Sequence, residues 1–179
     1  MSEEHTNKES FILRPFGPAI AKVTIPIEVI NLLNEYIDKT IKDGEKLKKL
    51  DYGHQLAGNV KQEFILEKEV IAQSGWGNFL SQSVSWWIQN SIQKKITNIE
   101  ILSTWIVRQF QNEYNPVHVH NGHISGVGYL KVPENLGKYE QENKKVNKNG
   151  TLTLIHGAKM FLSDSTFNIA PKVGEFYLF

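Results

Sequence analysis

The spacing of apolar residues predicts two helices in the first half of the chain. The first begins near Thr24 and Pro26, ends at Asp43-Gly44, and has apolar positions Ile30, Leu33, Ile37 and Ile41. The second extends from about Asn78 to Lys94, with one face formed by Leu80, Val84, Trp87, Ile88 and Ile92. The mixed, glycine-broken segment 45–64 between them is typical of a loop with a short helix.

After Lys95 the pattern changes to the β-branched and aromatic runs of strands. Residues 99–110, 125–132, 151–155 and 174–179 are the strand candidates, and 11–23 predicts one or two short strands broken by proline and glycine. The polar residues 1–10 predict a disordered tail, and the lysine- and asparagine-rich segment 133–150 predicts an exposed connection.

Helices followed by strands predict an α+β layout. We expect a single domain over residues 11–179, with a helical part at about 24–95 and a β part at about 96–179. The helices would cover the outer face of a β sandwich or barrel.

Composition narrows the chemistry that the chain can perform. Its 179 residues contain no cysteine, which excludes disulfides, thiolate nucleophiles, iron–sulfur clusters and cysteine-ligated zinc. A metal would need nitrogen and oxygen ligands. The net charge of +1 gives no support for a nucleic-acid partner, and the polar start and the absence of a long apolar run predict a cytoplasmic protein without a membrane span.

The segment Asn115-Pro116-Val117-His118-Val119-His120 carries the clearest chemical signal. Residues two apart in an extended segment point to the same side, so His118 and His120 can direct their imidazoles at one point, as a chelated metal requires. The preceding Asn-Pro pair is a turn signal that would place the histidines at the mouth of a strand.

Together with later motifs, this segment resembles a family of 2-oxoglutarate/iron(II)-dependent oxygenases common in marine phages and bacteria. The matching motifs are NPVHVH, then SGVGYLKVP, then the glycine before residues 151–154, then the Pro171-x-x-Gly174 turn before an aromatic strand. The upstream segment LAGNVKQEF also resembles this family, so the likeness covers about residues 50–179.

The resemblance implies a double-stranded β-helix, or jelly roll, with N-terminal helices packed on the outer face of its major sheet. It implies an oxidoreductase that uses iron(II) and the cosubstrate 2-oxoglutarate, with His118 as the first iron ligand. Related oxygenases usually have a carboxylate at position 120. Here His120 either ligates as a further neutral nitrogen, which we favour, or lies beside the ligands while water fills the position.

The family's pattern continues beyond the last residues given, to a distal histidine and to an arginine that anchors 2-oxoglutarate. We therefore expect the last strands to be missing from a chain that ends at Phe179. Within the chain, Arg108 and Tyr129 are the candidates for binding the cosubstrate carboxylates, although a structural ion pair and a core position are the simpler interpretations.

Two other functions remain open from the sequence. One is a non-catalytic jelly-roll module, such as a binding or virion-associated protein. The other is a cupin-like metal protein that uses His118, His120 and His156 without 2-oxoglutarate. His156 follows a predicted strand, and a structural or surface role is its simpler interpretation.

Overall fold

The computed structural model describes residues 10–13, 17–137 and 147–179, which group into two compact units. One unit combines residues 1–25 with 126–179, and the other contains residues 26–125. Nine residues of the expected N-terminal tail and the middle of the expected connection 133–150 lie outside the described residues. The described ends of that connection are mostly exposed, as predicted.

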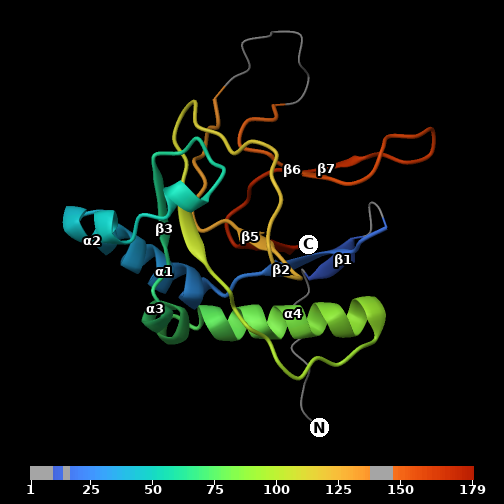
Figure 1. The fold of residues 1–179 in the computed structure, drawn as a ribbon, viewed down its shortest axis with the longest axis horizontal. Coiled ribbons are helices and arrows are strands. Elements are labelled where there is room, and N and C mark those ends of the chain that lie inside the picture. Colours follow the sequence, from blue (N-terminus) through green and yellow to red (C-terminus); the bar gives the residue numbers. More distant parts are fainter. Residues whose placement is uncertain (1–9, 14–16, 138–146) are drawn as a thin grey trace. The chain divides into compact units, whose positions relative to one another are not determined.

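The unit that includes the C-terminal segment contains a four-stranded antiparallel sheet (Figure 1). Its strand order is β1 (Phe11–Leu13), β2 (Ile20–Thr24), β8 (Glu175–Leu178) and β5 (Gly126–Gly128). The strands expected in 11–23, 125–132 and 174–179 are therefore present, and an N-terminal strand pairs with the last strand of the chain.

A second antiparallel ladder in this unit pairs β6 (Leu152–Ile155) with β7 (Thr166–Ile169). The core of the unit forms around Ile20, Ile169 and Tyr177, and the half-buried residues packed against it include Leu154 and Phe167. Strand β7 was not predicted, because TFNI offers only two apolar residues. Those two residues nevertheless pack, because alternate side chains of a strand share one face.

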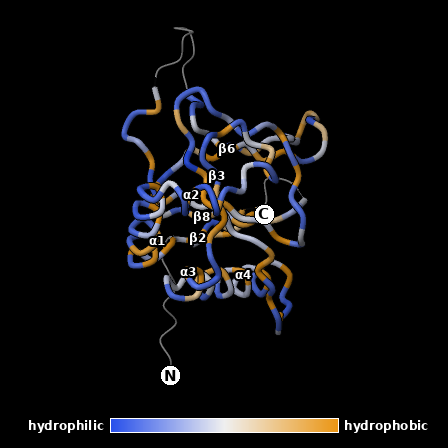
Figure 2. The backbone as a smooth tube through the Cα atoms, turned by 60° about the vertical axis from the view of Figure 1, so that its left-hand side comes forward, coloured by the Kyte–Doolittle hydropathy of each residue, from blue (hydrophilic) through white to orange (hydrophobic). Residues whose placement is uncertain are grey.

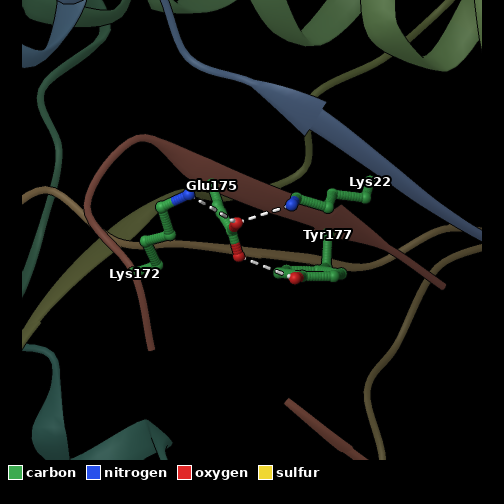
Figure 3. A network of polar contacts seen from close by, with 4 residues as sticks. All are labelled: Lys22, Lys172, Glu175 and Tyr177. Atoms are coloured by element: carbon green, nitrogen blue, oxygen red, sulfur yellow. Dashed lines mark hydrogen bonds and ion pairs between the residues drawn. The ribbon is translucent and has the colours of Figure 1, made fainter. Parts of the chain in front are cut away.

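A polar network lies on the sheet where β2 pairs with β8 (Figure 3). The Lys22 Nζ lies 2.5 Å from Glu175 Oε1, and the Tyr177 hydroxyl donates to Glu175 Oε2 at 2.7 Å. Lys172 Nζ is more distant, at 3.8 Å from Oε1, and exposed. Glu175 is buried, so these donors supply the hydrogen bonds that its carboxylate loses from water.

The other unit contains the helices: α1 (Ile27–Thr40), α2 (Gly44–Lys49), η1 (Gly53–Gln55), α3 (Lys68–Gln73) and α4 (Trp76–Ile92). Both long helices were predicted. Figure 2 shows hydrophobic and hydrophilic positions interleaved along them, as in helices that bury one face. In α4 the buried face is shifted from the predicted one, since Phe79 is buried and Ile92 is exposed.

Strand β3 (Gln62–Ile65) pairs with β4 (Trp105–Arg108) in an antiparallel ladder within this second unit. The assignment of 45–64 to loop and short helix is therefore wrong at its end, where β3 begins. The predicted strand over 99–110 is confirmed only at 105–108, and residues 93–104 have no regular structure. Phe64 is completely buried, so β3 contributes to the core despite its polar first residues.

The mixture of helices and antiparallel sheets is consistent with the predicted α+β class. The described strands close no barrel, and the jelly roll stays a prediction. Among the helices of the described residues, none has the length and apolar character that crossing a bilayer requires.

Candidate metal centre

His118 and His120 lie side by side in the segment that follows β4. Their ring centroids are 4.7 Å apart, with 48° between the ring planes. The segment is not part of a ladder: β4 ends at Arg108 and β5 begins at Gly126, so the histidines do not lie at the mouth of a strand as predicted. It is held instead by a bridge in which Asn59 N donates to Tyr114 O at 2.8 Å. Both histidine side chains are exposed, so the two adjacent rings lie together on the surface.

A hydrogen bond fixes which nitrogen of His118 is available. Its Nδ1 lies 2.8 Å from the Pro116 carbonyl oxygen. A carbonyl only accepts, so Nδ1 must carry the proton and donate it. In the neutral ring this leaves the lone pair on Nε2, which is the arrangement that metal-binding histidines adopt.

His120 is oriented by an aromatic side chain of β4. Its ring stacks on Trp105 with centroids 6.1 Å apart and 16° between the planes. Trp105 in turn lies 6.2 Å from the Tyr52 ring. Burial, and then the neighbouring His118, lower the pKa of His120, so its ring favours the neutral form that a metal ligand needs.

A buried carboxylate of β3 accompanies the histidines. Glu63 is only 3% exposed, and its Oε2 has no hydrogen-bond partner. Burial raises the pKa of Glu63, as do Asp51 and Glu113, whereas His118 lowers it. Sequence reasoning missed this residue, although a glutamate next to the apolar run Phe64-Ile65-Leu66 was a usable signal.

Gly58 marks the place where the segment before β3 meets the histidine segment. A Cβ atom at Gly58 would lie 2.5 Å from Asn115 Oδ1 and 2.7 Å from Glu63 Oε1. Both distances are shorter than any normal carbon–oxygen contact. The absence of a side chain at position 58 therefore allows Asn115 and Glu63 to approach the same point.

The donor set of the pair fits iron(II), because imidazole nitrogens are suitable ligands for this ion. Two such nitrogens supply part of a coordination shell. In the part of the chain that the structure describes, no three histidine, aspartate or glutamate side chains are grouped so that they could hold a metal together.

The predicted cosubstrate residues occupy structural positions. Arg108 donates to Gln62 Oε1 across the β3–β4 ladder, and its guanidinium lies 5.2 Å from the Phe110 ring centroid. Tyr129 belongs to the other unit, where it packs against the core around Ile20. Burial, and then the Glu175 charge, raise the pKa of Tyr129 to about 12. Cosubstrate binding by either residue stays a prediction.

His156, the third histidine of the cupin-like alternative, follows β6. Its backbone N–H donates to the Ser165 carbonyl oxygen at 2.9 Å, which closes the β6–β7 ladder, and its side chain is exposed. The position agrees with the simpler interpretation of a surface residue.

Comparison with known proteins supports the resemblance seen in the sequence. Residues 103–179 match the family model described as "Putative 2OG-Fe(II) oxygenase". The match extends from just before β4 to the end of the given sequence and contains both histidines, Arg108 and Tyr129. No curated protein and no solved structure gives a significant match.

Proposed function

We propose that this protein is an iron(II)- and 2-oxoglutarate-dependent oxygenase whose metal is held by His118 and His120. The observation that carries the proposal is the adjacent pair of imidazoles, 4.7 Å apart, inside the segment that matches the oxygenase family. The family match alone points to the reaction class, and the ring geometry adds a place where a cation can bind.

The bound iron and 2-oxoglutarate would together activate oxygen, so that the cosubstrate is converted to succinate and carbon dioxide while a substrate is hydroxylated. The chain's own residues hold the imidazoles ready for this role. The Pro116 carbonyl keeps the proton of His118 on Nδ1, and the His120 ring stacks on Trp105.

We propose Tyr129 and Arg108 as residues that can each donate to a cosubstrate carboxylate, and each is considered within its own unit. With a pKa of about 12, the Tyr129 hydroxyl stays protonated at neutral pH and can donate a hydrogen bond to a carboxylate. The Arg108 guanidinium offers several further N–H donors besides the one bound to Gln62.

Metal titration with and without the cosubstrate tests the proposal. Purified protein is titrated with cobalt(II), and anaerobically with iron(II), while the metal's absorption bands are recorded before and after addition of 2-oxoglutarate. We expect binding that His118→Ala and His120→Ala each weaken by at least about tenfold, since removing one of few ligands removes much of the affinity. His123→Ala, an exposed neighbour, is the matched control.

Addition of 2-oxoglutarate should change the metal bands, and succinate should form only with iron(II), oxygen and the intact pair. Metal binding whose absorption bands do not change when 2-oxoglutarate is added would contradict the oxygenase and favour a cupin-like metal protein. A protein that binds no metal would favour a non-catalytic module.

A further inference from the structure

Glu63 is the most deeply buried charged residue in the part of the chain that the structure describes. It lies in the middle of β3, opposite Val107 of β4, next to the completely buried Phe64. Its Oε2 is inaccessible to water and makes no hydrogen bond. An ionised carboxylate in this situation costs several kcal/mol, so a folded protein keeps one only where something compensates it.

The charges around Glu63 show which group favours its ionised form. Asp51 and Glu113 oppose ionisation, because they carry the same charge. His118 acts in the opposite direction and favours the ionised carboxylate. A positive charge at the position of His118 would therefore favour the ionised form of Glu63.

Two hydrogen bonds hold the histidine segment beside β3. Asn59 N donates to the Tyr114 carbonyl oxygen at 2.8 Å, and Lys61 N donates to Glu113 Oε1 at 3.3 Å. Asn115 Oδ1 and Glu63 Oε1 both lie next to Gly58, and Asn115 precedes His118 by three residues. The arrangement depends on both segments, so Glu63 and the histidine pair form one local structure.

We infer that Glu63 is a positioning residue that compensates the charge of a divalent cation bound by His118 and His120. The inference rests on the metal site proposed above. Two neutral imidazoles leave the charge of a divalent cation unbalanced, whereas a two-histidine, one-carboxylate site reduces it. A nearby buried carboxylate supplies that negative charge without being a ligand itself.

Binding of the cation and burial of Glu63 then stabilise each other. Without the cation, the ionised carboxylate is unfavourable in its place, because its Oε2 is buried and makes no hydrogen bond. With the cation, the same position becomes favourable for the charge. A purely structural glutamate has no such dependence, and replacing it with the neutral isostere would leave metal binding unchanged.

Cobalt(II) affinity of the full chain distinguishes these two cases. The variants are Glu63→Gln, which removes the charge and preserves the shape, and Glu63→Asp, which preserves the charge. Glu69→Gln, an exposed glutamate on α3 of the same unit, is the control. We expect Glu63→Gln to weaken cobalt(II) binding about 10–100-fold, the usual range for residues that support metal ligands, and Glu63→Asp to weaken it less.

The free energy of unfolding of the metal-free variants is measured in parallel. We expect Glu63→Gln to be as stable as the parent or more stable, because it removes a buried charge without a partner. Equal cobalt(II) affinities of Glu63→Gln and the parent would overturn the inference. Loss of affinity in proportion to loss of folded protein would overturn it as well.

The two proposals fail in different ways. If the parent protein binds no cobalt(II), or if His118→Ala binds it equally well, the metal site itself is wrong and the role of Glu63 fails with it. If the parent binds cobalt(II) and Glu63→Gln binds it equally well, only the inference about Glu63 fails. A site that binds cobalt(II) but does not respond to 2-oxoglutarate contradicts the oxygenase. The comparison of Glu63→Gln with the parent then still tests the role of Glu63 in metal binding.

Discussion

Gly126 and Gly128 are the residues at which β5 tolerates no side chain. A Cβ atom would lie 2.5 Å from a ring carbon of Phe176 at position 126, and 2.7 Å from another at position 128. Both glycines are on the same face of the strand, and Phe176 on the neighbouring β8 covers that face. Phe176 is buried, so its ring cannot easily move away.

We expect Gly128→Ala to lower the free energy of unfolding by about 1–3 kcal/mol, the usual cost of overpacking a core. Urea denaturation measures the change. Gly17→Ala is the control in the same unit, because a Cβ atom there meets no other atom within 4 Å. Equal stabilities of the two variants would show that Phe176 yields to the added methyl group.

At the level of residues, the sequence was informative about His118 and His120 and gave only a weak signal for Glu63, a glutamate next to an apolar run. Two histidines one residue apart are brought together by any locally extended backbone, so their proximity follows from spacing alone. The burial of Glu63 depends on pairing between β3 and β4, whose sequences are about 40 residues apart. Local patterns contain no information about such a pairing.

The pairing of β2 with β8 depends on an ion pair and on apolar contacts. Burial alone would raise the pKa of Glu175, but the hydrogen bonds from Lys22 and Tyr177 reverse that effect and hold it below its ordinary value of 4.5. A carboxyl group with a lowered pKa in the folded state stabilises the protein above its unfolded pKa. That stabilisation is lost as the pH falls through the folded value, which lies below 4.5.

Glu175→Gln should therefore reduce stability at neutral pH and have little effect in acid. We expect a loss of about 3 kcal/mol at pH 7, because Lys22 then stays largely buried without its partner. The difference between the variant and the parent should shrink progressively below pH 4.5. Urea denaturation at a series of pH values measures both curves, and a constant difference between them would contradict the role assigned to the ion pair.

Among the elements, the long helices and the aromatic strands could be predicted, and the short or polar elements could not. Helix α1 buries Ile30, Leu33 and Ile37, as their spacing indicated. Strand β3 begins with Gln62 and Glu63, which do not alternate with apolar residues, and α3 has only six residues. Elements this short are stabilised by tertiary contacts, so their own sequences specify them weakly.

Across the described chain as a whole, the most exposed large apolar side chains lie in two segments. One contains Val117 and Val119, which alternate with the proposed metal ligands, and the other is the turn between β6 and β7. In that turn Phe161 is 99% exposed and Leu162 is 91% exposed. Met160 and Ser163 close the turn with hydrogen bonds in both directions, at 2.9 and 3.3 Å.

The same substitution should therefore affect stability differently at two phenylalanines near this turn. Phe161→Ser should leave the free energy of unfolding within about 0.5 kcal/mol of the parent, because the ring makes almost no contacts. It should also raise the concentration at which the protein aggregates, since it removes part of an exposed apolar patch. Phe167→Ser removes a ring that packs on the core of Ile20, Ile169 and Tyr177, and should cost more than about 1 kcal/mol. Urea denaturation and light scattering measure the two effects, and a large loss of stability in Phe161→Ser would mean that the ring is covered in solution.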